Sequence, residues 1–585
     1  MNHTQREPGD PFASPDTPTL QTVLDRLDIL PDITPARRND LRSAIRTFCK
    51  LTGRDPRDIV AGPVRIRHLL TQCKPARHGI SHARWNNVRS LLSRAMDLAE
   101  IRVSAGNMLA PMQHGWEALY EQLPTKHMKC HMSRLFRHLS VRGVSPQTVT
   151  LADIEHCETD NLASVLSEPL RGNQRLRKTW MRARRMIQGW PDIHLDVPDL
   201  RKTYGVADEL LPSSYVADVE AFLTWSGRYD AFDDETGPIR PVRQSTVKNK
   251  RHALRAMVSA AIRNGVPIDG LRSLADLVEP DTVRAALRFL AEHHGEQRSA
   301  TLEGRMAQIV IVARDWVKVP QSQLDVLRKL AGRVAPDHRG GMTEQNRGIL
   351  REFEDPKLVL RLVQLPDALF ELACREPIDG WVRGQKQSGA VAVAILLAAP
   401  IRVLNLSRIQ IGRNLVRIGA DRGHRYELYF APDEVKNSIE LSMPLPAWVS
   451  SFIDRYLEDG RRTLTEVASP WLFPGLPGRP VTTCTMTTRI GAVTERHLGV
   501  RMTPHKFRHV AGALHLRDNP AQHEVVRRLL GHKNLSTTLD FYAGMEQSAA
   551  TRHYSTTIEA RRQELLQNPA LLETAARRRK KGRSE

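Results

Sequence analysis

The chain has 585 residues, of which 41% are hydrophobic, and it carries a formal net charge of +21 with a pI near 10. At roughly 150 residues per domain this length favours two to four domains, and the hydrophobic content argues against wholesale disorder. The basic excess points first to nucleic acid as a partner, although a merely soluble basic protein stays open on charge alone.

The N-terminal segment, residues 1–18, is rich in Pro, Asp, Ser and Thr and predicts a flexible lead-in with no apolar signal sequence. Six cysteines are scattered without a C-x-x-C pair, which fits a reducing compartment. The longest apolar run, residues 390–401, is too short to cross a bilayer and predicts a buried helix. We therefore expect a cytoplasmic, nucleoid-associated protein that makes no membrane contact.

Helical periodicity dominates the chain from residue 19 to residue 333, and strand-like alternation is nearly absent there. We divide this part into helical bundles at 19–105, 106–205 and 206–333. A weak repeat supports the division, because residues 136–154 resemble residues 257–277, with a fainter copy around Gly53. In the two clearer copies a basic helix ends at a glycine, which suits a left-handed cap, and a helix beginning L-A-D follows. Coincidence among helix caps is the alternative, since the period is not steady.

Basic residues gather on helices of the second and third bundles. Such runs usually mark solvated helix faces, but the overall charge makes phosphate contact at least as strong an alternative. The clusters are Arg177, Lys178, Arg182, Arg184 and Arg185, and then Lys248, Lys250, Arg251 and Arg255.

A turn-rich segment at 334–344 predicts a linker, and a further domain is expected over 345–565. That domain begins with helices. Three short runs, NLVRIG, YELYFA and IELSMPL, then predict a small three-stranded antiparallel sheet before helices resume at Pro446. A basic tail is expected over 566–585. The fold class is therefore mainly α and multi-domain, with helical bundles followed by a mixed α+β domain.

Six residues of this last domain have the chemistry needed to break a DNA strand. The reaction needs a nucleophile for phosphorus, guanidinium groups for the developing negative charge and a proton donor for the leaving oxygen. Arg402 begins an amphipathic helix, Lys436 lies in the turn between the second and third strands, and His505 and Arg508 are three residues apart on one helix. In chain order the set is Arg402, Lys436, His505, Arg508, His532 and Tyr542.

This order resembles the tyrosine recombinases of the phage-integrase family, whose pattern is Arg, hairpin Lys, His-x-x-Arg, His or Trp, and Tyr. The framing segments WLFPG (471–475) and LLGHKNLSTT (529–538) are also similar to the family's. The resemblance covers about 345–560. It is weaker over 206–333, which resembles the family's core-binding domain, and it is thin before residue 200.

The resemblance implies a site-specific recombinase or integrase that cuts and rejoins DNA through a 3′-phosphotyrosyl intermediate. It implies integration or excision of a mobile element, with no metal or other cofactor. The implied partner is double-stranded DNA, with self-assembly as a dimer or tetramer on it, and a need for partner recombinases is left open. By this resemblance, Arg402 and Arg508 would clamp the scissile phosphate, and Tyr542 would form the covalent link to it. Lys436 would protonate the leaving 5′-oxygen. His505 would help accept the tyrosine proton or steady the phosphate, and His532 would hydrogen-bond a phosphate oxygen.

The sequence departs from the family pattern at Pro400, near a position where members often have Gly, and at Asn405, where many have Glu. His505 and His509 stand at zinc-ligand spacing, but position 506 is Lys and no acidic third ligand is evident. Tyr554 is a rival nucleophile outside the matched frame.

Two other functions stay open: an architectural DNA-binding protein that does not cut, and a type IB topoisomerase that relaxes DNA without strand exchange. After Tyr542, a helix near 556–567 carries Ile558 and Leu565 on a charged surface. Docking of this segment on a neighbouring protomer and packing within the same chain are equal alternatives.

Overall fold

The computed structural model describes residues 17–31, 33–101, 110–200, 204–229, 232, 242–337, 341–378, 380–419, 425–465, 468–519 and 522–567. Residues 1–16 of the expected lead-in and 568–585 of the expected tail lie outside this part of the chain. Helices dominate the described residues, so the mainly α fold class is confirmed. None of the described helices is long and apolar enough to span a membrane, and all six cysteines are free thiols.

The chain separates into two compact units, Pro198–Gly340 and the remainder, Met1–Val197 with Gly341–Glu585. Within the larger unit, the segment before residue 200 has two separate hydrophobic cores. The second of these is aromatic, with the rings of Trp116 and Phe136 4.7 Å apart between centroids. The first core is built by α1 (Leu20–Ile29), α2 (Pro35–Thr52), α3 (Pro63–Gln72) and α4 (His82–Leu98), and the second by α5 (His114–Glu121), α6 (Lys126–Val141), α7 (Leu151–Ser164) and α8 (Pro169–Met186).

The smaller unit is a helical bundle around one apolar core. The helix α13 ends in a short π-helical turn, after which Lys318 adopts a left-handed backbone conformation. The helices are α9 (Ser213–Gly227), α10 (Gln244–Arg263), α11 (Leu274–Leu277), α12 (Pro280–His294), α13 (Ala300–Ile311) and α14 (Gln321–Val334).

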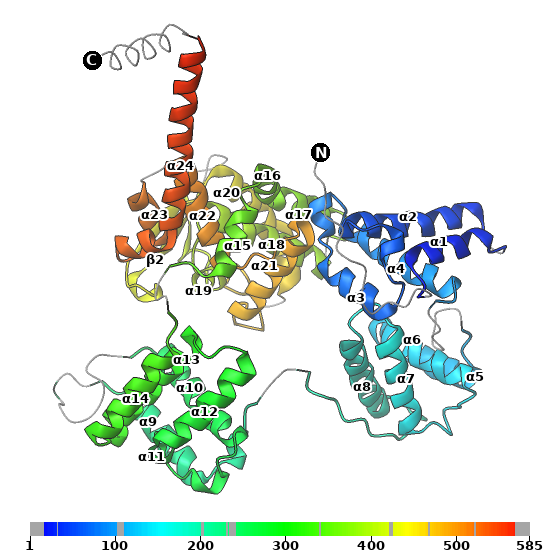
Figure 1. Ribbon diagram of the computed structural model, residues 1–585, viewed down its shortest axis with the longest axis horizontal. Helices are drawn as coiled ribbons and strands as arrows, with labels where there is room; N and C mark the ends of the chain where they lie inside the picture. Colours follow the sequence, from blue (N-terminus) through cyan, green and yellow to red (C-terminus); the bar gives the residue numbers. More distant parts are fainter. Residues whose placement is uncertain are drawn as a thin grey trace, which may run out of the picture. The chain divides into compact units, whose positions relative to one another are not determined.

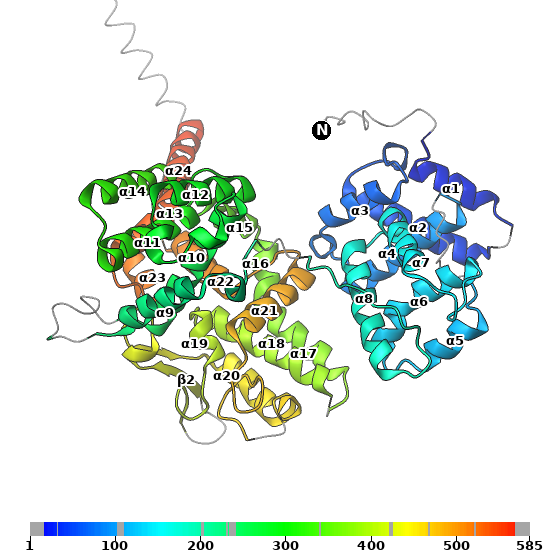
Figure 2. The same cartoon turned by 90° about the horizontal axis from the view of Figure 1, so that it is seen from below.

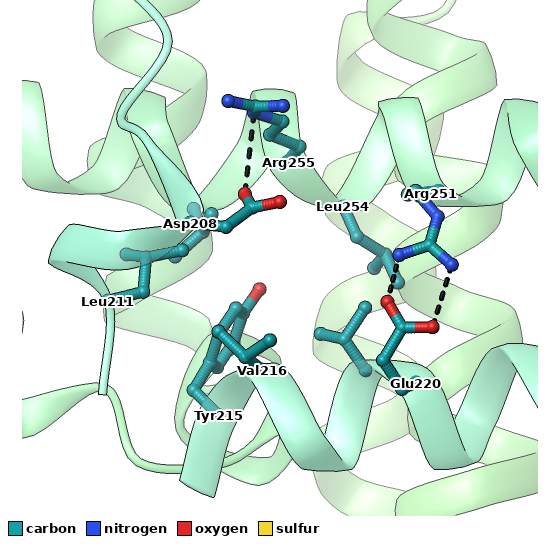
Figure 3. Close-up of a pocket in the computed structure, with 10 residues that line it drawn as sticks. Asp208, Leu211, Tyr215, Val216, Glu220, Arg251, Leu254 and Arg255 are labelled. Carbon is teal, nitrogen blue, oxygen red and sulfur yellow. Dashed lines mark hydrogen bonds and ion pairs between the residues drawn. The ribbon is translucent and has the colours of Figure 1, made fainter. Parts of the chain in front are cut away.

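The basic cluster on α10 is only partly a solvated face. Lys250 is buried: its Nζ donates to Ser226 Oγ at 3.1 Å and lies 5.2 Å from the centre of a phenylalanine ring. Both interpretations of that lysine, as a solvated charge or as a phosphate contact, are therefore wrong. Arg255 lies 3.6 Å from Asp208, and Arg251 pairs with a glutamate of α9, on either side of a small cavity of about 30 Å³ (Figure 3).

The glycines of the suspected repeat have the left-handed conformation expected of them. Gly53, Gly143 and Gly265 have φ values of 66°, 71° and 94°. After each one the next amide donates back to the carbonyl five residues earlier, as in Arg54 to Cys49 and Val266 to Ala261. The same local geometry thus recurs three times, while a common origin of the bundles stays a prediction.

The region after residue 341 is built around α18, whose residues 390–396 are wholly buried, as the apolar run predicts. In Figures 1 and 2 this helix lies among α17, α20, α21 and α22, all of which contact it. The helices are α15 (Glu344–Glu352), α16 (Pro356–Val363), α17 (Leu365–Cys374), α18 (Trp381–Ala398), α19 (Val403–Ser407), α20 (Ala447–Arg455), α21 (Thr483–Leu498), α22 (Pro504–Asp518), α23 (His523–Leu530) and α24 (Leu535–Gln567).

The three expected strands form one antiparallel sheet in the order β1 (Leu415–Ile418), β2 (Arg425–Phe430) and β3 (Leu441–Pro444). Leu428 and Phe430 of the central strand point into the core, and Tyr429 between them is exposed, which is the period of two that the sequence shows. Between β2 and β3 a ten-residue connection, 431–440, carries Lys436.

Candidate active site

Arg402 is the N-cap residue of α19 and has an extended backbone. Leu406 of this short helix and Ile401, next to the cap residue, are both fully buried. Their packing fixes the backbone from which the Arg402 side chain extends. Its side chain is half-buried, and this desolvation lowers the pKa of Arg402. The sequence-based placement of this arginine at a helix start is confirmed.

Arg508 lies on the second turn of α22, which begins at Pro504 after the N-cap Thr503. It is only 6% exposed, and its Nη1 donates to the Pro400 carbonyl at 2.5 Å, while Nη2 donates to the Leu530 carbonyl. The guanidinium therefore ties α22 both to the segment before Arg402 and to the segment before His532. Burial lowers its pKa to about 10, with nearby Arg402 adding to the effect.

Neither Arg402 nor Arg508 has a carboxylate within ion-pair distance among the described residues. Buried charges in proteins are normally paired, because removing an ion from water costs several kcal/mol. A guanidinium has five N–H groups, and the two carbonyl bonds of Arg508 leave three of them for another acceptor. Two neighbouring cations without an anion describe a site prepared for an anionic ligand, and forked donors of this kind suit phosphate.

Three histidines surround the two arginines, and each has a lowered pKa. Desolvation is the largest cause for all of them, followed by the positive charge of Arg508 for His505 and His532, and by His505 for His509. The pKa falls to about 4 for His509 and His532, so these imidazoles are neutral at pH 7.

Hydrogen bonds define how the histidines are oriented. His505 Nε2 and His509 Nε2 lie 3.0 Å apart, and the Asn346 amide nitrogen lies 3.2 Å from the same His509 atom. Because the amide nitrogen can only donate, His509 Nε2 accepts and His505 donates, which leaves Nδ1 of His505 as a proton acceptor. His532 Nδ1 is bonded to the Thr538 hydroxyl at 2.9 Å.

Tyr542 is on α24 and is 1% exposed, against the backbone of α22. Its hydroxyl donates to the carbonyls of Arg508 and His509, at 3.4 Å each. The ring fits there because residue 512 is glycine: a Cβ on Gly512 would lie 2.6 Å from Tyr542 Cζ and closer still to its oxygen. Burial raises the pKa of this tyrosine, while the Arg508 charge lowers it by a smaller amount.

Lys436 is exposed in the β2–β3 connection, as expected, and that connection is fastened on both sides of it. Asn405, one helical turn into α19, donates to the Glu434 carbonyl at 3.2 Å. Asn437 donates to the Gly531 carbonyl at 2.9 Å, next to His532. All the predicted residues except Lys436 thus lie together around the guanidinium groups of Arg402 and Arg508. Lys436 lies on a loop that is hydrogen-bonded to α19 and to the segment that precedes His532.

Sequence reasoning missed three residues of this region. The sequence spacing presents His509 only as a zinc-ligand candidate, yet it is a neutral buried member of the histidine group, and the described residues contain no group of three metal-ligand side chains. The sequence presents Asn405 only as a departure from the family pattern, and it gives no role to Asn437, although the position of Asn437 next to Lys436 is a signal that points to it. The rival nucleophile Tyr554 lies twelve residues beyond Tyr542 on the same helix, about 18 Å along its axis, and is exposed.

Comparison with known proteins adds evidence independent of this geometry. Residues 386–548 match the model of the phage integrase family. The chain is 26% identical over 267 residues to the tyrosine recombinase XerD of Pseudomonas aeruginosa, which covers 42% of this chain and 81% of the relative. It is 31% identical over 180 residues to XerD of Pseudomonas putida, covering 30% of this chain and 55% of the relative.

Solved structures with local similarity include XerA recombinase, with a TM-score of 0.23, 15% identity and coverage of 54% of this chain and 92% of that chain. Another is the Tn1549 transposon integrase in complex with circular intermediate DNA, with a TM-score of 0.32, 16% identity and coverage of 54% and 94%. The family match spans every residue of the gathered site, from Arg402 to Tyr542. Residues 386–548 therefore form a domain of the phage integrase family, and the relatives that the chain is similar to are tyrosine recombinases.

Proposed function

We propose that this protein cuts and rejoins DNA at a specific site through Tyr542, for the integration or excision of a mobile element. The observation that carries the proposal is a pair of guanidinium groups, Arg508 buried and Arg402 half-buried, with no carboxylate partner among the described residues, beside the buried Tyr542. A scissile phosphodiester supplies the missing negative charge, and its trigonal-bipyramidal transition state carries more of it.

In the proposed reaction the Tyr542 oxygen attacks phosphorus, the bond to the 5′-oxygen breaks, and a 3′-phosphotyrosyl link forms. The tyrosine proton passes to the histidine group, for which the free Nδ1 of neutral His505 is the acceptor. Lys436 gives a proton to the leaving 5′-oxygen, and His532 holds a non-bridging oxygen. Attack by a 5′-hydroxyl reverses the sequence, because the phosphotyrosyl bond keeps the energy of the broken one.

The proposal assigns duplex DNA as the partner, with the protein self-assembling on it. The net charge of +21 supports DNA binding through phosphate contacts, and helices in grooves would supply the sequence preference. The described side chains of α24 beyond residue 550 are all exposed, which supports contact of this segment with another molecule rather than packing within the chain.

A suicide substrate, nicked beside the scissile phosphate so that the cleaved fragment diffuses away, tests the proposal. The native chain should form a covalent adduct, and Tyr542→Phe should bind the same DNA without forming one. Tyr554→Phe is the matched control and should still form the adduct. Tight binding with no adduct in the native chain would instead favour an architectural protein. Relaxation of supercoiled plasmids of any sequence, without strand exchange, would favour a topoisomerase.

A further inference from the structure

The helix α15 contacts the histidine group from outside the matched family segment, and it carries none of the six predicted residues. It begins shortly after Gly340, where the smaller unit ends, and it packs against α22. Met342, just before the helix, is 7% exposed and belongs to the apolar cluster that contains Tyr542. At the other end, Arg517 of α22 donates from Nη1 to the Phe353 carbonyl at 3.3 Å. Both ends of α15 are therefore fastened to the catalytic region.

Asn346 lies on the first turn of α15, where the helix cap fixes its backbone. Its amide N–H donates to the side chain of the N-cap residue Thr343 at 3.3 Å. Its side-chain nitrogen Nδ2 lies 3.2 Å from His509 Nε2, and His509 Nε2 lies 3.0 Å from His505 Nε2. Asn346, His509 and His505 thus form a relay of hydrogen bonds that runs from α15 to a predicted site residue.

Asn346 is the member of this relay whose role is fixed by its chemistry. An amide nitrogen can only donate, whereas each ring nitrogen of a neutral histidine can be a donor or an acceptor. His509 is neutral at pH 7, because burial, followed by the charges of His505 and Arg508, lowers its pKa to about 4. His509 Nε2 must accept from Asn346, so it carries no proton, and its hydrogen bond with His505 requires the proton to be on His505 Nε2. The amide of Asn346 thereby decides which nitrogen of His505 keeps a lone pair.

We propose that Asn346 is a positioning residue for DNA cleavage. Through His509 it holds the proton of His505 on Nε2 and leaves Nδ1 free to accept the proton of Tyr542. The proposal rests on the proposed function for the role of His505, and Asn346 acts only through the relay. The segment that follows the smaller unit therefore sets the proton arrangement of the proton acceptor. An asparagine that only stabilised α15 would have no effect on the tautomer of His505.

Two substitutions of Asn346 separate these roles. Asn346→Asp keeps the shape of the side chain, but a carboxylate only accepts hydrogen bonds. His509 Nε2 must then donate, which reverses the relay and moves the His505 proton to Nδ1. General acid–base catalysis contributes about 10²–10⁴-fold, so single-turnover cleavage of a suicide substrate should slow by about a hundredfold or more. Asn346→Ala removes the donor without imposing the reverse order, and it should slow cleavage by a smaller factor.

Gln345 provides matched controls, because it is the neighbouring residue on α15 and its side chain is exposed. Gln345→Glu adds the same charge as Asn346→Asp, and Gln345→Ala removes the same kind of amide as Asn346→Ala. Both controls should cleave at the rate of the native chain, and all the variants should keep its DNA affinity, measured by anisotropy. Equal losses of cleavage in Gln345→Glu and Asn346→Asp would mean that added negative charge is the cause, and the proposal would be overturned.

The tautomer of His505 can be read directly in the full chain without DNA. The ¹⁵N shifts of selectively labelled histidines distinguish protonated from unprotonated ring nitrogens, and His505→Gln identifies the signals of this residue. We expect a proton on Nε2 in the native chain and in Gln345→Glu, and a proton on Nδ1 in Asn346→Asp. A proton on Nδ1 in the native chain, or one that stays on Nε2 in Asn346→Asp, would refute the proposal. If the shifts are as expected but the native chain forms no adduct through Tyr542, the proposed function is overturned while the relay stands, so the two failures are distinguished.

Discussion

Filling the space beside Tyr542 tests how this tyrosine is held. In Gly512→Ala the new methyl group would lie 2.6 Å from Cζ and 3.1 Å from Cε2 of Tyr542, whereas unstrained carbon contacts are about 3.5–4.0 Å. The ring must move by roughly 1 Å, or leave its site, because buried apolar side chains, among them Val526 and Leu530, also pack around it. Overpacking of this size costs about 1–3 kcal/mol. The hydroxyl would also lose its bonds to the Arg508 and His509 carbonyls.

We expect Gly512→Ala to lower the unfolding midpoint by several degrees and to make Tyr542 reactive towards nitration, measured by mass spectrometry of the modified peptide. Gly172→Ala is the control, since it is also a helical glycine but has no neighbour within 4 Å, and it should stabilise the protein by about 0.5–1 kcal/mol. In a double-mutant cycle Tyr542→Ala should remove most of the cost of Gly512→Ala. Additive costs, or a Tyr542 still protected from nitration in Gly512→Ala, would refute this packing of the ring against the glycine.

Four further predictions concern pH, the Lys436 loop, a buried hydroxyl and the C-terminal helix. The pKa of His532 in the folded protein is about 4, below the ordinary 6.5, so between these pH values the unfolded chain binds more protons than the folded one. The free energy of unfolding should therefore reach its highest value above pH 6.5 and fall as the pH drops towards 4. His532→Gln should flatten this part of a profile of denaturant midpoint against pH. Asn437→Ala removes the hydrogen bond to the buried Gly531 carbonyl, which fixes the loop that carries Lys436. Single-turnover cleavage should slow at least tenfold, while the DNA affinity measured by anisotropy stays the same. An unchanged cleavage rate would show that this hydrogen bond does not position Lys436. Tyr215→Phe removes a buried hydroxyl that has no partner among the described residues, so its melting temperature should equal or exceed that of the native chain, and a clear loss would contradict the assignment. Deleting residues 556–585 should reduce assembly on DNA in sedimentation measurements, and unchanged assembly would exclude docking of this segment on a neighbouring protomer.

The residue types and the local elements could be predicted from the sequence because short-range physics decides them. The apolar run at 390–401 could only be a buried helix, and the alternation around Leu428 could only be a half-buried strand. A glycine after a basic helix gives a left-handed cap wherever it occurs, as at Gly143 and Gly265. The order of the six site residues also needed no coordinates, since it is a property of the chain.

The environment of those residues could not be predicted, because it depends on segments far apart in sequence. Lys250 sits in a basic run and has the pattern of an exposed charge, yet helix packing places it against Ser226. His509 appeared to be a metal-ligand candidate, and only the approach of Asn346, 163 positions away, shows it as a neutral hydrogen-bond acceptor. Burial and electrostatics sum over all neighbours in space, and sequence spacing carries little of that information.

The sequence by itself determined the order of six candidate residues, namely two arginines, two histidines, a lysine and a tyrosine, and the local elements that carry them. Tertiary structure alone decided that the two guanidinium groups lose water without gaining a carboxylate among the described residues, and that Tyr542 packs against Gly512. The physical reason is that charge desolvation and steric fit arise only where backbone segments distant in sequence pack together. Each of these features involves at least two such segments.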